Sequence, residues 1–117
     1  MAVSQQSQTT TVTISSGGSL STAADLKGLT VLGVQMPAGW DAAQITCQGS
    51  ADGTTYGDVY SGTTEQTIGG ATPAALRYII VPPTALPGIR YLKLRSGTGA
   101  TPVNQTADRV LTIITAK

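Results

Sequence analysis

The sequence predicts an all-β domain, an antiparallel and jelly-roll-like β-sandwich of about seven to eight short strands. Short runs of alternating apolar and polar residues recur along the chain, and turn-forming residues separate them about every 8–12 residues. Charged residues make up only 11% of the chain and aromatic residues 4%, while small, β-branched and turn-forming residues dominate. Such residues favour strands and tight turns over amphipathic helices. The chain shows no strand-helix alternation, which argues against a parallel α/β sheet.

The length predicts a single domain. A domain of 117 residues buries roughly two-thirds of the surface of its unfolded chain. The first residues are uncharged and have no hydrophobic period, so we predict a flexible arm over residues 1–9 and one sandwich domain over residues 10–117. The start of the chain lacks the apolar core of a signal peptide, and no run approaches the ~20 apolar residues of a membrane span. We therefore expect synthesis in the cytoplasm and no membrane partner.

The first predicted strand covers residues 9–14, where Val12 and Ile14 share one face. A serine- and glycine-rich segment ends this strand, and residues 23–27 have room for one helical turn. The next strand covers residues 30–36, where the alternation predicts a shared face for Leu32, Val34 and Met36.

The middle of the chain predicts a hairpin. Ile45 and Cys47 alternate inward before the turn. Asp52-Gly53 is a tight-turn signal, because glycine tolerates positive φ at little cost. The two hairpin strands, and a weaker third strand, cover residues 43–50, 56–60 and 65–68.

The last third of the chain predicts three strong strands, over residues 76–82, 89–95 and 109–115. The first is apolar on both faces, which indicates a central strand covered on each side. In the second, Leu92 and Leu94 face one way, and the opposite face carries Tyr91, Lys93 and Arg95. The third is dense in β-branched residues, as strands are.

The residue inventory argues against an enzyme. Histidine is absent, so the usual general base is missing. Asp52 and Asp58 flank the predicted hairpin and could approach each other, but turn formation and solvation explain them more simply. The glycine-rich stretches lack the lysine and the following helix of a phosphate loop. We predict no catalytic residues and no cofactor.

The sequence also offers few groups that could bind metal ions or nucleic acids. Zinc has no ligand set, and Asp41, Asp52 and Asp58 offer at most a weak calcium site, so we predict no metal site. The net charge is +1 and the seven basic residues are scattered, which argues against phosphate binding. The single cysteine, Cys47, is expected to be a small buried hydrophobe, with a reactive thiol as the alternative.

Five residues are candidates for contact with a partner, namely Trp40, Tyr56, Tyr60, Tyr91 and Arg95. Tryptophan is favoured at interfaces and on sugar-stacking platforms, and the alternative for Trp40 is a plug over one end of the sandwich. Tyr56 and Tyr60 are four residues apart on one predicted strand and hence on one face, in the core or at the surface. Arg95 belongs either to a modest basic strip or to a solvated outer face.

Two segments resemble small structural proteins encoded in the head and tail modules of tailed bacteriophages. In residues 33–60, GVQMPAGWDAAQITCQGSADGTTYGDVY, the shared features are a strand, a Met-Pro-Ala bend with tryptophan, a second strand and a Ser-x-Asp-Gly-Thr hairpin. Residues 75–98, ALRYIIVPPTALPGIRYLKLRSGT, are similar to the same group. Together the two segments cover about half of the chain.

This resemblance implies a virion component assembled in the host cytoplasm. The candidates are a capsid decoration (cement) protein, a head-fibre base and a small tail protein. The resemblance further implies a homo-oligomer, with a trimer favoured, that binds the major capsid protein or other virion proteins. The arm could then reach the shell or a neighbouring copy by adding a strand to an exposed sheet edge.

The same segments also resemble discoidin-type, galactose-binding-like jelly rolls. The shared features are the hairpin at residues 50–53 with an aromatic after it, and the strand at residues 77–79 that leads to residues 89–90. Tyr56 stands where that family has tryptophan, and the terminal cysteines are missing. The resemblance implies an alternative function, a carbohydrate-binding or adhesion module of a phage fibre or tail, with Trp40 as a contact.

Overall fold

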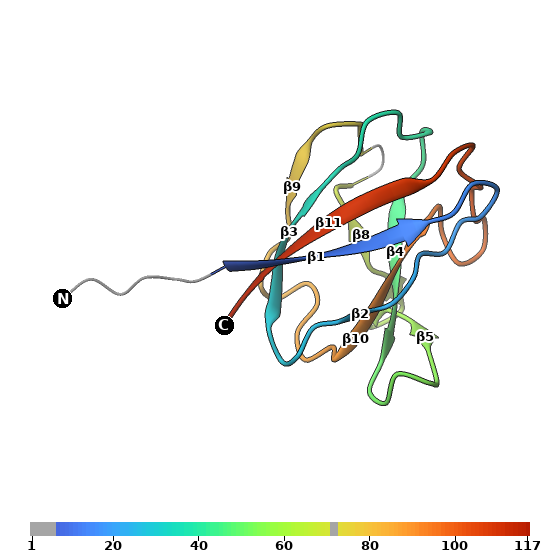
Figure 1. Ribbon diagram of the computed structural model, residues 1–117. Coiled ribbons are helices and arrows are strands. Elements are labelled where there is room, and N and C mark those ends of the chain that lie inside the picture. Colours follow the sequence, from blue (N-terminus) through green and yellow to red (C-terminus); the bar gives the residue numbers. More distant parts are fainter. Residues whose placement is uncertain (1–6, 71–72) are drawn as a thin grey trace.

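The first and last strands of the chain lie side by side in one sheet of a sandwich (Figure 1). The computed structural model describes residues 7–70 and 73–117, and all regular structure within these ranges is β-strand. The strands are β1 (Ser7–Ile14), β2 (Ala24–Asp25), β3 (Thr30–Gln35), β4 (Ile45–Ser50), β5 (Gly57–Asp58), β6 (Tyr60–Ser61), β7 (Thr64–Glu65), β8 (Thr67–Ile68), β9 (Tyr78–Ile80), β10 (Tyr91–Ser96) and β11 (Arg109–Ala116).

Two antiparallel sheets form the sandwich. The first sheet has the strand order β1-β11-β3-β9, and the second has the order β2-β10-β4-β5, with β8 also paired to β4. The short strands β6 and β7 form a separate hairpin. Of the long strands, β1, β3 and β11 belong to the first sheet and β4 and β10 to the second, so among these strands the chain crosses between the sheets after β3 and again after β10. The prediction of an all-β, antiparallel sandwich is confirmed.

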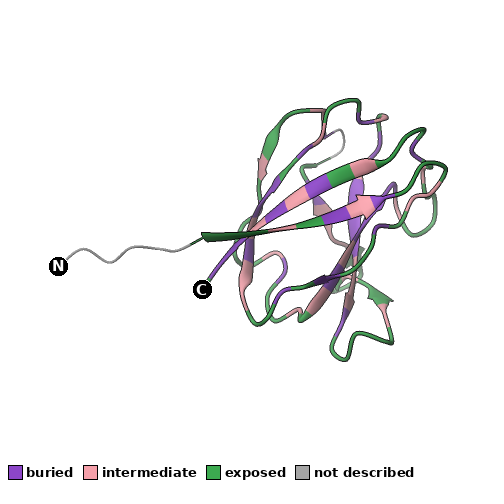
Figure 2. Ribbon diagram, viewed as in Figure 1, coloured by how far each residue is buried: buried purple, intermediate pink, exposed green. Residues whose placement is uncertain are grey.

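The inner faces of the two sheets share one hydrophobic core, and buried positions alternate with more exposed ones most clearly along β1 and β11 (Figure 2). Burial of these apolar side chains is the main favourable contribution to folding. Side chains exposed by no more than 1% come from both sheets and include Val12, Ile14, Val34, Met36, Ile45, Cys47, Leu92, Leu94, Leu111 and Ile113.

The alternation in β3 is interrupted by a bulge. The sequence predicts that Leu32 shares the inward face of Val34 and Met36; those two are buried, but Leu32 is only half-buried. The register between β3 and β11 shifts at this point, so that the adjacent Val31 takes the core position and is 1% exposed. An extra residue in one strand reverses the facing of the residues beyond it.

The strand β9 is an edge strand, and the prediction of a central strand covered on both faces is wrong. It spans three residues and pairs only with β3 among the strands of its sheet. Tyr78 and Ile80 are 51% and 77% exposed, while Ile79 packs against the core. An apolar run in sequence does not reveal that one of its faces meets solvent.

The turn after β4 is a longer loop than the predicted tight hairpin. Gly49 pairs with Gly57, so the intervening residues form a loop around Asp52. The Asp52 carboxylate accepts hydrogen bonds from the N–H groups of Thr54 and Thr55 at 2.8 and 2.9 Å. This side chain builds the loop from within, as aspartate commonly does in turns.

Three further expectations need correction. Residues 7–9 of the predicted arm belong to β1, where Ser7 pairs with Ala116, and residues 1–6 lie outside the described ranges. The predicted helical turn at residues 23–27 contains instead the strand β2, which pairs with β10. The predicted strand at residues 56–60 is divided into β5 and β6, because β6 turns away from β4 to pair with β7.

Candidate protein-interaction surface

The outer face of the first sheet is built by three alternating strands and the edge strand β9. On β1, Val12 and Ile14 point into the core, so the threonines between them point outward. On β11, Leu111 and Ile113 are buried in the same way. The outward residues of the four strands are Thr9, Thr11, Thr13, Gly33, Gln35, Tyr78, Ile80, Val110, Thr112 and Ile114, which we call the charge-free face.

Strand register brings these residues into rows across the sheet. One row runs from Thr11 through Thr112 and Gln35 to Tyr78. The next runs from Thr9 through Ile114 and Gly33 to Ile80. Side chains in such rows are direct cross-strand neighbours. The face therefore changes from threonine at β1 to large apolar side chains at β9, and no residue in it carries a charge.

Most of the exposed large apolar side chains of the described chain gather at this sheet. Ile80 is 77% exposed, Tyr78 51% and Val110 47%, and Leu76, just before β9, is 71% exposed. An ideal Cβ built on Gly33 would collide with the Tyr78 ring, so the missing side chain is what lets the ring lie flat across β3. Apolar patches of this kind on soluble proteins commonly mark interaction sites.

Leu76 is held in an uncommon backbone conformation. Its φ is +64°, in the left-handed region, which costs a non-glycine residue roughly 1–2 kcal/mol. Two hydrogen bonds fix it: its N–H donates to the Pro37 carbonyl at 3.2 Å, and its carbonyl accepts from the Gln35 amide at 3.2 Å. The surrounding structure thus stabilises an exposed leucine at a strained position, which is a feature typical of functional segments.

The outer face of the second sheet is charged instead. Tyr91, Lys93 and Arg95 of β10 all point to this side, as their alternation predicts. The Lys93 Nζ lies 4.2 Å from the centroid of the Tyr56 ring, within cation–π range. Arg90, just before β10, forms a 2.7 Å ion pair with Asp25. The two outer faces of the sandwich therefore differ sharply in charge.

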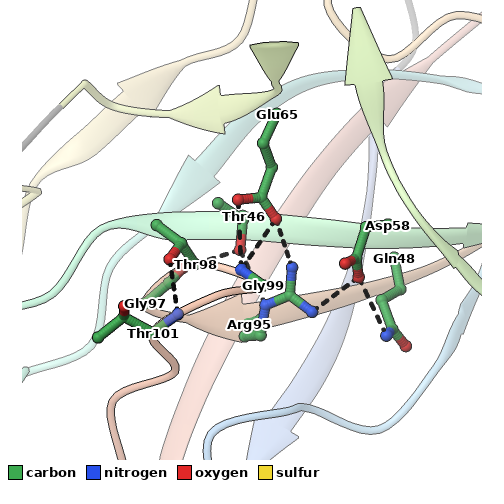
Figure 3. A network of polar contacts seen from close by, with 9 residues as sticks. All are labelled: Thr46, Gln48, Asp58, Glu65, Arg95, Gly97, Thr98, Gly99 and Thr101. Atoms are coloured by element: carbon green, nitrogen blue, oxygen red, sulfur yellow. Dashed lines mark hydrogen bonds and ion pairs between the residues drawn. The ribbon is translucent and has the colours of Figure 1, made fainter. Parts of the chain in front are cut away.

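Arg95 is the centre of a polar network beneath the β6–β7 hairpin (Figure 3). Its guanidinium forms ion pairs with Asp58 at 2.8 Å and with Glu65 at 2.6 Å, and its Nε donates to the Thr46 hydroxyl at 3.0 Å. Glu65 also accepts a 3.0 Å hydrogen bond from the N–H of Gly99. The network ties β5, β7 and the loop after β10 onto the middle of the sheet, so we assign Arg95 a structural role.

The electrostatics of this network favour the ionised form of the Asp58 carboxylate. The hydrogen bond from Arg95 lowers the pKa of Asp58 below its ordinary value of 3.8, and desolvation opposes this only in part. Arg95 itself is 6% exposed, so it is not available to a partner, and its prediction as a contact residue is corrected.

The prediction of Trp40 as a contact residue is corrected as well. Its side chain is 9% exposed and belongs to the core cluster, and its Nε1–H donates to the Ala43 carbonyl at 3.4 Å. The alternative prediction for Trp40, a plug over one end of the sandwich, describes its position. Beside it, the fully buried Gln105 donates to the Asp41 carbonyl at 3.1 Å and accepts from the Asp41 N–H at 2.9 Å, which closes this end of the sandwich.

The three candidate tyrosines occupy different places. Tyr56 and Tyr91 are half-buried on the charged face, where the Arg90 guanidinium carbon lies 5.2 Å from the Tyr91 ring centroid. Tyr60 is 55% exposed on β6 and does not share a strand with Tyr56. The structure does not bring the five candidates together at one surface. The outward pattern of β1 and β11 was visible in the sequence, but their adjacency to β9 was not.

The carboxylates considered for catalysis or calcium are each engaged elsewhere. Asp41 accepts a 2.6 Å hydrogen bond from the Thr106 N–H, Asp52 binds its own loop, and Asp58 binds Arg95. No group of three or more potential metal ligands occurs among residues 7–70 and 73–117. Cys47 is buried, and desolvation raises the pKa of its thiol to about 12, so it is a thiol and not a thiolate near neutral pH.

A small polar pocket lies between the open end of β1 and the turn after β2. Its volume is about 130 Å³, and its lining includes Thr10, Asp25 and Lys27. Pockets for small-molecule ligands commonly measure about 300–1,000 Å³ and are largely apolar. The charge-free face is therefore the stronger candidate for a functional site.

Comparison with protein-family models, curated proteins and solved structures gives no significant match for this chain. Within the part of the chain that the structure describes, no helix has the length and apolarity needed to cross a membrane.

Proposed function

We propose that this chain is a structural protein without enzymatic activity that binds a protein surface through the charge-free face. More specifically, we propose a virion protein of a tailed bacteriophage, a capsid decoration protein or head-fibre base that binds the major capsid protein. The observation that supports binding is the charge-free face itself. The phage assignment is supported by the resemblance of residues 33–60 and 75–98 to head and tail structural proteins.

The composition of the charge-free face suits contact with another protein. Burying this face removes no charged side chain from water. Desolvation of a charge is the largest free-energy penalty that burial of a polar surface would incur. Burying the exposed parts of Leu76, Tyr78, Ile80 and Val110 contributes roughly 1–2 kcal/mol each. The sum, roughly 4–8 kcal/mol, is similar to the cost of about 4–15 kcal/mol for immobilising one partner on another. A single copy would bind weakly, so the proposal includes an oligomer, with a trimer favoured, that binds through several copies at once.

The alternative function, a carbohydrate-binding module, loses its main contact residue. The Trp40 indole is inside the core and cannot stack on a sugar. One face of the Tyr56 ring is occupied by Lys93. The structural-protein proposal depends on neither residue.

A capsid-occupancy measurement tests the proposal. Purified particles that lack the protein are incubated with the wild-type chain, with Gln35→Lys and with the control Thr54→Lys. Gln35 is exposed in the charge-free face, and Thr54 is exposed in the loop between β4 and β5. Burying an unpaired lysine is costly, so Gln35→Lys should weaken binding at least about tenfold while Thr54→Lys binds as the wild type does.

Two results would contradict the proposal. If Gln35→Lys occupies the particles as well as the wild type, the charge-free face is not the contact. If the wild-type chain itself fails to bind particles from the phage that encodes it, the decoration function is wrong. Specific binding of the wild-type chain to a glycan array would favour the carbohydrate alternative instead; Trp40→Ala would not test it, because Trp40 packs in the core.

A further inference from the structure

The edge strand β9 presents unpaired backbone groups at the rim of the first sheet. The Met36 N–H donates to the Arg77 carbonyl at 2.8 Å, and the Val81 N–H donates to the Leu32 carbonyl at 3.0 Å. Residues 77 and 81 therefore direct these groups toward β3. Because main-chain groups alternate in an antiparallel pair, Tyr78 and Ile80 direct theirs away from it. The sheet ends at β9, and no strand of the described chain pairs with this edge.

The β9 edge is only partly protected against pairing with another chain, by the shortness of the strand and by Pro82 two residues beyond Ile80. Natural edge strands are blunted by inward charges, proline, bulges or a covering loop. Tyr78 and Ile80 are instead apolar and more than half exposed. The opposite edge differs, since on β1 Thr13 exchanges two hydrogen bonds of 3.0 Å with Thr22. Within the described residues, no hydrogen bond reaches the outward main-chain groups of Tyr78 and Ile80.

The register of β1 identifies a segment that could cover this edge. Ser7 begins β1 and pairs with Ala116, and residues 1–6, which precede it, lie outside the described ranges. The segment Met-Ala-Val-Ser-Gln-Gln, residues 1–6, contains no charged side chain, proline or glycine. Six residues in extended form span roughly 20 Å, which exceeds the length of β9. Its uncharged composition also matches the charge-free face beside the edge.

We propose that residues 1–6 of one copy pair with the outer edge of β9 of a second copy and extend its first sheet by one strand. Each copy then carries one donor segment and one acceptor edge. Contacts of this head-to-tail kind close into rings when the rotation between copies allows it, and a trimer is one such ring. The occupant is a second copy, so this contact forms without a capsid; it specifies how the oligomer of the proposed function would form, and the capsid-occupancy measurement does not test it.

Complementation between two variants tests the proposal. Deletion of residues 2–6 leaves a chain with an acceptor edge only. Ile80→Pro leaves a chain with a donor segment only, because proline removes the outward N–H and keeps the bonds to β3. Ile80→Thr is the matched control, since it changes the side chain and keeps the N–H. The molar mass of each protein in solution is measured by light scattering after size exclusion and by sedimentation equilibrium.

The wild type and Ile80→Thr should associate, and each of the other two variants should be a monomer. An equimolar mixture of the deletion and Ile80→Pro should form a dimer that contains one copy of each. Association of the deletion variant by itself would overturn the proposal, because β9 would then pair with something other than residues 1–6. A mixture that stays monomeric, or a wild type that is monomeric at every concentration, would overturn it too.

Hydrogen exchange gives a second test that needs no variant. Raising the concentration of the wild-type chain should slow exchange of the Tyr78 and Ile80 amides at least about tenfold, because each gains a partner on association. The Thr54 amide, which already donates to Asp52, should not change. Unchanged exchange at Tyr78 and Ile80 during association would overturn the proposal, even if Ile80→Pro failed to fold.

Discussion

Replacing Arg95 by methionine should destabilise the sandwich strongly. Methionine keeps most of the apolar stem and removes the guanidinium, whose side chain is only 8% exposed. The substitution leaves the Glu65 carboxylate, 15% exposed, without its cation, and Asp58, 33% exposed, without its main partner. Breaking a buried ion pair costs about 3–5 kcal/mol, and the residual access of Asp58 to water places this case near 3 kcal/mol. That loss is a large part of the roughly 5–15 kcal/mol by which domains are stable.

The free energy of unfolding, from urea titrations followed by circular dichroism, measures this effect. Arg90→Met is the matched control, since Arg90 also forms an ion pair, at 2.7 Å with Asp25, but with side chains 49% and 37% exposed. Its substitution should leave stability nearly unchanged. Adding Glu65→Gln to Arg95→Met should recover part of the loss, because the unpaired charge is removed. The reasoning is refuted if Arg95→Met is no more destabilising than Arg90→Met, or if Glu65→Gln adds to the loss.

Two further predictions concern acid and backbone packing. The folded-state pKa of Asp58 lies below 3.8, so its contribution to stability is complete above that value and is lost as the pH falls through the folded-state pKa. At pH values below about 4, the urea concentration at the unfolding midpoint should therefore decrease, and it should decrease less steeply in Asp58→Asn. An equal decrease in both proteins would contradict this. Gly97→Ala should cost more than about 2 kcal/mol in the same titrations. Gly97 has φ +92°, and an added Cβ would lie 2.5 Å from the Thr101 carbonyl oxygen, whereas the control Gly57→Ala, with nothing within 4 Å, should unfold as the wild type does.

Several features of the fold could be predicted from the sequence because they depend on local period and composition. The alternation in β1 and β10 placed Val12 with Ile14, and Leu92 with Leu94, on shared faces, and in the structure these faces are buried in the core. The same local reasoning predicted Cys47 as a buried hydrophobe. A side-chain period of two residues and the scarcity of charge were enough to specify a two-layered antiparallel fold.

The loops and the bulge needed the assembled chain. The Asp-Gly signal predicted a tight turn, but Asp52 instead organises a longer loop whose length depends on how β5 and β8 share one edge of β4. The inward position of Val31 results from a register shift against β11, a strand about eighty residues away in sequence. Pairing between strands so far apart in sequence cannot be predicted from the residues near Val31.

The amino-acid sequence by itself determined the long strands, the inner face of most of them and the scarcity of charge, because each follows from neighbouring residues. Only the tertiary structure decided which strands are edges, and so turned Tyr78 and Ile80 from expected core into exposed surface. It also enclosed Trp40 and Arg95, which the sequence offered as contacts. The exposure of a residue depends on which distant parts of the chain pack against it, and the residues next to it in sequence do not reveal this.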